Sequence, residues 1–240
     1  MIASVDGCKG GWVVAVADGW PCKTPPRLMF SASFATVVSD TRTCHAVVVD
    51  MPIGLPSGPP ADDGQRGCDG LARQYLGLLG RDRVFLAPPR PTLVAKTPAE
   101  FQSIHKSLLT KGAGLPVWGI AGKLAEVDAL MSPTIQDRVF EFHPELAWAR
   151  LAGHTLSSKH CAAGIIERLG ILRGPVPKLE QLNEWDDSTV SGRAEIDDIL
   201  DALVGLAVAG GIVESPRSAC RLPVTEPPKD ARGLRMEIWY

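Results

Sequence analysis

The sequence predicts an α/β fold in which a mixed, five-stranded sheet is flanked by helices. Two apolar, β-branched runs at residues 1–5 and 12–17 enclose a glycine-rich turn, which is typical of paired strands. Residues 45–50 form a β-branched run of the kind found in strands buried on both faces. Apolar residues recur at helical spacing from 194 to 213, and Ser215-Pro216 ends that pattern. Strands and helices in this order favour a layered α/β fold.

The remaining elements complete the predicted sheet and its helices. Further strands are expected at residues 27–31 and 138–142, with an extra C-terminal strand at 235–240. Helices are expected at residues 34–40, 68–79, 98–109, 120–131, 144–151 and 157–172. Prolines and glycines crowd residues 51–98. We therefore predict a single domain over residues 1–240, with a loop-rich and helical insertion at about 55–135.

Composition narrows the class of protein. The 240 residues are 45% hydrophobic and 22% charged, as in an ordinary globular domain. The net charge of −2 provides no global positive field, so a nucleic-acid partner would meet only a local basic patch. The six cysteines include no CxxC pair, which argues against a zinc knuckle and for free thiols.

No signal peptide or long apolar span is evident, so we expect a cytoplasmic protein without a membrane partner. The oligomeric state is left open, and a homodimer is compatible with the sequence.

Acidic residues occur in three notable places. Asp6 and Asp50 end apolar strand runs, and strand ends in open α/β sheets face the crevice where ligands bind. On the late helix, Asp201 is three residues from Asp198 and four from Asp197, so these side chains can share a face. Clustered carboxylates repel one another, and Mg²⁺ or Mn²⁺ relieves that repulsion through oxygen ligands. We predict Asp6, Asp50, Asp198 and Asp201 as metal ligands and catalytic residues.

Each of these acids also has a structural explanation. Asp6 precedes a glycine and Asp50 a Met-Pro pair, so both residues can simply mark turns. Asp197 and Asp198 lie in the first turn of a helix, where acids complement the helix dipole. Asp201 lies deeper among apolar neighbours, and this explanation does not cover it.

A further acid follows the predicted strand at 138–142. Glu145, in a His-Pro-Glu sequence, is the fifth predicted catalytic residue, either as a metal ligand or as a group that orients water. Capping of the next helix explains Glu145 equally well. The roles of Glu141 and His143 stay open.

Basic residues gather in the loop-rich middle of the chain. Arg66, Arg73 and Lys123 are the predicted substrate-binding residues, because arginine and lysine hold phosphate groups through charge-assisted hydrogen bonds. A solvated charged surface explains each of the three as well.

Six short motifs, taken together, resemble those of a known family. In order they are Asp6-Gly7-Cys8-Lys9-Gly10-Gly11-Trp12, Val49-Asp50-Met51-Pro52-Ile53-Gly54-Leu55-Pro56, Arg66-Gly67-Cys68-Asp69, Lys123-Leu124-Ala125-Glu126-Val127-Asp128, Glu141-Phe142-His143-Pro144-Glu145 and Asp198-Ile199-Leu200-Asp201-Ala202. The chain resembles, over nearly its whole length, the domain of unknown function 429 family (DUF429), described as predicted nucleases of ribonuclease H-like fold.

The resemblance carries expectations about fold and site. It implies a ribonuclease H-like core with Asp6 on the first strand, Asp50 on the fourth, and Asp198 and Asp201 on the last core helix. The sequence departs from the expected pattern at residues 81–85, where Arg-Asp-Arg-Val-Phe replaces a Ser-Ser-Val-Phe-like stretch. A substrate role for that loop is therefore in doubt.

Three functions compete. The first is a divalent-metal-dependent nuclease, because carboxylate-held Mg²⁺ or Mn²⁺ ions can activate water for phosphodiester hydrolysis. The second is an actin-like or sugar-kinase-type phosphotransferase or ATPase, in which the glycine-rich turn after Asp6 would approach a nucleotide phosphate. No second glycine-rich phosphate loop is evident. The third is a non-catalytic binding module on the same fold, in which the acids would not converge on one cation.

Overall fold

A computed structural model describes residues 1–110, 112, 114–180, 190, 192–215 and 219–240. The chain forms two compact units. Unit 1 comprises Met1–Met51, Arg138–Cys220 and Trp239–Tyr240, and unit 2 comprises Pro52–Asp137 and Arg221–Ile238. The insertion predicted at about 55–135 falls within the first segment of unit 2. None of the helices in the described part of the chain is long and apolar enough to cross a membrane.

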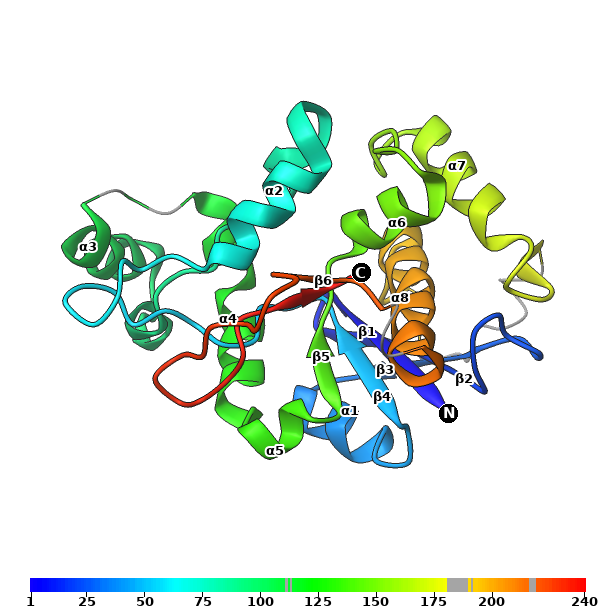
Figure 1. Ribbon diagram of the computed structural model, residues 1–240, viewed down its shortest axis with the longest axis horizontal. Coiled ribbons are helices and arrows are strands. Elements are labelled where there is room, and N and C mark those ends of the chain that lie inside the picture. Colours follow the sequence, from blue (N-terminus) through cyan, green and yellow to red (C-terminus); the bar gives the residue numbers. More distant parts are fainter. Residues whose placement is uncertain (111, 113, 181–189, 191, 216–218) are drawn as a thin grey trace. The chain divides into compact units, whose positions relative to one another are not determined.

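Unit 1 contains the mixed five-stranded sheet that the sequence predicts (Figure 1). Its strands are β1 (Ile2–Cys8), β2 (Gly11–Ala17), β3 (Arg27–Ser31), β4 (Ala46–Val49) and β5 (Val139–Glu141). Their order is β3-β2-β1-β4-β5. Pairing is antiparallel from β1 to β2 and β2 to β3, and parallel from β1 to β4 and β4 to β5. This layout is consistent with a ribonuclease H-like fold.

The first two strands form a tight hairpin. Cys8 pairs with Gly11 across the turn, and Gly10 adopts a φ of +77°, which glycine allows without strain. The prediction that Asp6 ends its strand is wrong, because β1 continues to Cys8 and Asp6 pairs with Val13 inside the hairpin. The strand is longer than its apolar run because the pairing with β2 extends through Gly7.

One face of the sheet packs against α8 (Ile196–Glu214), the helix predicted at 194–213 (Figure 1). The approach is close: a Cβ added at Gly205 would lie 2.0 Å from Ser4 Oγ, so any larger residue would force its neighbours to shift. Ile2 and Cys8 of β1 belong to the apolar core that includes α8. Side chains alternate along a strand, so Asp6 faces α8 as well.

Helices complete unit 1 on both sides of the sheet. On the face away from α8, Phe34 of α1 (Phe34–Asp40) packs on Trp12, with ring centroids 5.1 Å apart. On the α8 side lie α6 (Pro144–Ala152) and α7 (Ala162–Leu172), which contact α8 and each other. The predicted start of α7 at residue 157 is wrong. Residues 157–161 are not helical and include a turn at 159–160, and the helix begins after its N-cap at Cys161.

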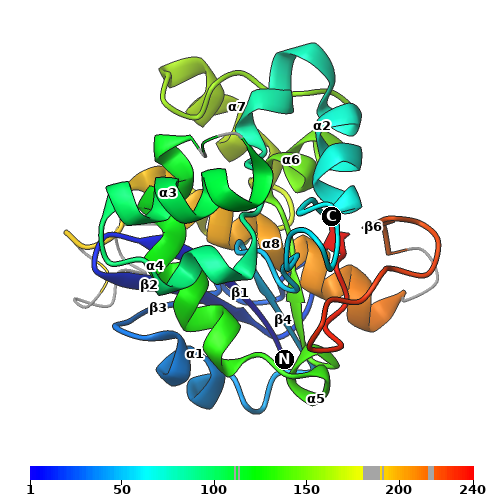
Figure 2. The same ribbon diagram turned by 90° about the vertical axis from the view of Figure 1, so that its left-hand side faces the viewer.

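Unit 2 is mainly helical, and Figure 2 shows its helices α3 and α4 side by side. Its elements are α2 (Gly67–Gly80), the short 3₁₀ helices η1 (Arg81–Arg83) and η2 (Arg90–Val94), α3 (Pro98–Leu109), α4 (Leu115–Leu130), α5 (Pro133–Gln136) and β6 (Arg221–Leu222). The strand predicted at 235–240 shortens to β7 (Ile238–Trp239), which pairs with β6 in a separate two-stranded sheet. No sequence pattern indicated β6, because two residues are too few for a period to be read.

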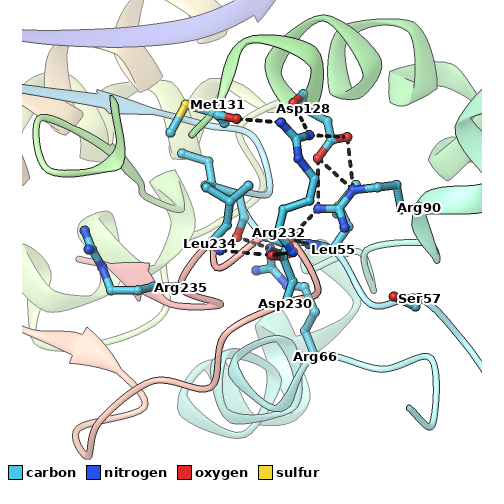
Figure 3. Close-up of polar contacts among 12 residues, drawn as sticks. Leu55, Ser57, Arg66, Arg90, Asp128, Met131, Asp230, Arg232, Leu234 and Arg235 are labelled. Atoms are coloured by element: carbon cyan, nitrogen blue, oxygen red, sulfur yellow. Dashed lines mark hydrogen bonds and ion pairs between the residues drawn. The ribbon is translucent and has the colours of Figure 1, made fainter. Parts of the chain in front are cut away.

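An ion-pair network holds distant segments of unit 2 together (Figure 3). The Arg90 guanidinium donates to both carboxylate oxygens of Asp128 at 3.1 Å and also pairs with Asp230. Arg232 donates to Asp128 as well, at 3.1 Å. Asp230 further accepts the backbone N–H of Leu55 at 3.0 Å. The network therefore joins η2, α4, the loop after β4 and the segment before β7.

Candidate functional site

Three predicted acids gather in unit 1. Asp6 of β1 and Asp201 of α8 are buried, and Asp50 follows β4 directly and is half-buried. The Asp50 backbone N–H donates to the Val5 carbonyl at 3.0 Å, so the β1–β4 ladder sets Asp50 beside Asp6. The side chains of Asp6 and Asp50 are hydrogen-bonded. Two carboxyl groups can share such a bond only when one of them holds a proton.

The electrostatics of these three residues are coupled. Burial raises the pKa of Asp6 well above its usual value, and the charges of Asp50 and Asp201 raise it further. Burial likewise raises the pKa of Asp50 to about 7, with a second contribution from Asp201. Burial also raises the pKa of Asp201, against the opposing effects of Lys159 and Trp148. The cluster therefore retains protons at a pH where ordinary aspartates are ionised.

Lys159 contributes an ammonium group to this cluster, which the sequence did not indicate. Its Nζ donates to Asp201 Oδ2 at 2.7 Å and lies 3.3 Å from Asp197 Oδ2. Burial lowers the pKa of Lys159, but the attraction of Asp201, Asp6 and Asp197 outweighs burial and holds that pKa above its usual range. A single lysine in a polar turn has no sequence pattern that would distinguish it from a solvated residue.

Glu145 is tied to a buried arginine. Arg168 of α7 donates to Glu145 Oε1 at 2.7 Å, and both side chains are buried. The Arg168 guanidinium lies 5.5 Å from the ring centroid of Trp148, whose indole N–H donates to Asp201 Oδ1 at 2.8 Å. Glu145 thus has an internal counter-charge, and Trp148 connects this pair to the acidic cluster. Neither Arg168 nor Trp148 was predicted as part of the site.

Asp198 has a structural role at the start of α8. Its Oδ2 accepts the backbone N–H of Glu195 at 2.9 Å, completing a reciprocal capping box. Burial raises the pKa of Asp198, and its charge in turn raises the pKa of Asp6. Asp198 therefore adds negative potential to the cluster while its carboxylate caps the helix.

The predicted basic residues all belong to unit 2, whereas the acids belong to unit 1. Arg66 is buried, and its guanidinium is 2.9 Å from Asp69 and donates to the carbonyl of Gly54 at 3.2 Å. Its side chain therefore stabilises the start of α2 and is not exposed to a phosphate. Arg73 donates to the Val84 carbonyl at 2.9 Å and is half-buried, as is Lys123.

The two residues with open roles border the site in sequence. Glu141 is the buried last residue of β5, and His143 is the N-cap residue of α6, where it is half-buried. His143 makes no side-chain capping bond to α6.

The chemistry of the cluster fits a hard divalent cation, because its donors are carboxylate oxygens. As the side chains lie, however, the described residues contain no group of three or more His, Cys, Asp or Glu arranged to hold a metal ion. At Asp201 each carboxylate oxygen accepts a hydrogen bond, Oδ1 from Trp148 and Oδ2 from Lys159. A cation on Oδ2 would therefore lie beside the Lys159 ammonium.

Comparison with known proteins identifies a family. A family model described as "Protein of unknown function (DUF429)" matches residues 5–226, which is nearly the whole chain. No curated protein and no solved structure matched the chain. The chain therefore belongs to the DUF429 family of proteins of unknown function.

Proposed function

We propose that the protein is a divalent-metal-dependent nuclease, with Asp6, Asp50 and Asp201 as the metal ligands. The observation that carries the proposal is the electrostatic coupling of these carboxyl groups beside α8. Burial raises the pKa of all three, and the charge of Asp201 further raises the pKa values of Asp6 and Asp50. Strongly perturbed carboxyl groups are concentrated at functional sites. The β3-β2-β1-β4-β5 order adds support, since it is consistent with a ribonuclease H-like fold.

The charges near the cluster are unbalanced in a way that a divalent cation would correct. Asp198 raises the pKa of Asp6, and Asp197 lies 3.3 Å from Lys159 Nζ, whose charge offsets part of this negative potential. When bound, Mg²⁺ or Mn²⁺ would lower the pKa of a water molecule and stabilise the departing oxygen of a phosphodiester.

The side chains around the ligands have separate tasks in this proposal. Trp148 fixes the orientation of Asp201 through its 2.8 Å hydrogen bond. In this proposal Glu145, which was predicted as catalytic, instead holds α6 and α7 together beside the site through its 2.7 Å contact with Arg168. Asp198 caps α8 and contributes negative potential.

The test combines metal binding with cleavage. Purified protein is incubated with Mn²⁺ and single-stranded or structured nucleic acid, and we expect slow cleavage that Asp50→Asn abolishes, because losing a ligand loses the metal. Asp40→Asn is the matched control, since Asp40 is an exposed aspartate of unit 1 at the end of α1. The net charge of −2 means that binding depends on local basic residues, so activity should fall steeply with added salt.

Other outcomes would replace the proposal. Turnover of ATP without any cleavage of nucleic acid, stopped by Asp6→Asn, would favour the phosphotransferase or ATPase alternative. Thermal melting gives an independent reading, because an ion that binds only the folded state raises the melting temperature by mass action. A melting temperature unaffected by millimolar Mg²⁺ or Mn²⁺, with no turnover of either substrate, would favour a non-catalytic binding module.

A further inference from the structure

Lys159 is seated in the acidic cluster, although it lies outside the regular elements that form it. Its Nζ contacts Asp201 at 2.7 Å and Asp197 at 3.3 Å, and its side chain is 29% exposed. We propose that Lys159 is an internal counter-ion that must leave Asp201 before the divalent cation binds, so that it sets the metal concentration at which the site fills. This inference rests on the proposed metal site and concerns its regulation.

Both carboxylate oxygens of Asp201 have donors in this state. Trp148 Nε1 occupies Oδ1 at 2.8 Å, and Lys159 Nζ occupies Oδ2 at 2.7 Å. A divalent cation on Oδ2 would lie directly beside the ammonium, and two cations at that separation repel strongly where water screens poorly. Metal coordination by Asp201 and its ion pair with Lys159 therefore exclude each other.

Of the two donors, Lys159 is the one that can move. Trp148 is fully buried in α6 and is further held by the Arg168 guanidinium 5.5 Å from its ring centroid. Lys159 lies in the turn before α7, partly exposed, on a side chain with four rotatable bonds. Exchange at Asp201 should therefore proceed by withdrawal of the lysine, while the tryptophan keeps the carboxylate oriented.

The counter-ion has a clear consequence for the metal-free protein. Attraction from Lys159 lowers the pKa of both Asp6 and Asp50, so the ammonium partly offsets the repulsion within the cluster. When the metal binds, the single positive charge of Lys159 would be replaced by the double positive charge of the cation. Removing the lysine should leave more uncompensated negative charge, and the affinity for a divalent cation should rise.

The first experiment measures Mn²⁺ affinity by isothermal titration calorimetry at pH 8. Lys159→Met keeps the length of the side chain without its charge, and we expect it to bind Mn²⁺ at least tenfold more tightly than the wild type. Lys159→Arg retains the charge and should bind much as the wild type does. Lys23→Met, which removes an exposed lysine elsewhere in unit 1, is the surface control.

The second experiment uses the wild-type protein and needs no variant to fold. Lysines are labelled by reductive methylation, and the labelling of Lys159 is followed by peptide mass spectrometry with and without saturating Mn²⁺. We expect Mn²⁺ to increase the labelling of Lys159 severalfold, because withdrawal frees its amine, and to leave Lys23 unchanged.

The outcomes separate this inference from the proposed function. If the wild type binds Mn²⁺ but Lys159→Met binds it no more tightly, or if Lys159 labelling ignores the metal, the counter-ion inference is overturned and the metal site stands. If neither the wild type nor Lys159→Met binds Mn²⁺, the metal site fails and the inference fails with it.

Discussion

Replacing Asp50 by asparagine should stabilise the metal-free protein at neutral and alkaline pH. The amide keeps the shape of the side chain and removes a charge that burial and Asp201 disfavour. Its nitrogen can also donate a hydrogen bond to the Asp6 carboxylate. If the Asp50 carboxylate instead belonged to a stabilising ion pair, the substitution would destabilise the protein. The sign of the change in unfolding free energy therefore distinguishes the two cases.

The magnitude follows from the pKa. Burial first, and then Asp201, raises the pKa of Asp50 from 3.8 to about 7. One pKa unit corresponds to about 1.36 kcal/mol, so ionising Asp50 in the native state costs at most roughly 4 kcal/mol at pH 8. The native state holds the proton in a range where the unfolded chain has lost it. The contribution of Asp50 to wild-type stability should therefore fall as pH rises from about 4 to about 7 and level off above that.

Urea unfolding followed by circular dichroism at pH 4, 6 and 8, with a chelator present, checks this prediction. Asp50→Asn should match the wild type at pH 4 and exceed it by up to roughly 4 kcal/mol at pH 8. Asp40→Asn, at an exposed site, should behave as the wild type does at every pH. An Asp50→Asn variant that is less stable than the wild type at pH 8 would refute the reasoning, because the carboxylate would then be a net stabilising group.

Three further substitutions test the packing and the buried charges by urea unfolding. Gly205→Ala should lose about 1–3 kcal/mol, since the added Cβ would lie 2.0 Å from a side-chain oxygen of β1. Gly211→Ala, where a Cβ meets nothing within 4 Å, should lose no stability and serves as its control. Arg168→Met should cost about 3–5 kcal/mol by removing the positive charge that pairs with the buried Glu145, and a smaller loss would mean that other contacts or water stabilise Glu145. Arg90→Met should cost about 2 kcal/mol through its lost bonds to two aspartates, and no measurable loss would show that the network of Figure 3 contributes little.

The regular elements were predictable because each contains enough residues to show the spacing of apolar residues that is typical of a strand or a helix. The strand at 27–31 and the helices at 34–40 and 98–109 have the bounds expected from the sequence. The start of α7 was not predictable in this way, because residues 157–161 are compatible with helix propensity but lie outside the helix, with a turn at 159–160. A close local contact accompanies this boundary: a Cβ added at Gly164 would lie 2.1 Å from the Ser158 carbonyl oxygen.

The candidate site was predictable only in its acids. Asp50 and Asp201 stand out from apolar surroundings in the sequence. Because Asp50 follows a strand and Asp201 lies on the apolar side of a helix, the sequence also predicts which way each side chain points. Lys159, Trp148 and Arg168 come from α6, α7 and the turn between them, and their contacts with the acids join residues far apart in sequence. No spacing rule connects such residues. Arg66 was predicted to bind substrate but lies in a buried ion pair with Asp69. The sequence does not distinguish an arginine at the surface from one in a buried ion pair.

Buried charged residues are paired differently in the structural ion pairs than in the candidate site. Arg66 pairs with Asp69 and Arg168 with Glu145, each pair combining one positive with one negative side chain at less than 3 Å. Such pairing is how a folded chain usually tolerates charge away from water. Around Asp201 the same chain gathers several carboxyl groups about one lysine and leaves their pKa values raised. A neutral side chain would remove that destabilisation, so a fold selected for stability alone has no reason to keep the cluster. The cation binding that we propose would supply a reason, because it would convert the repulsion into affinity.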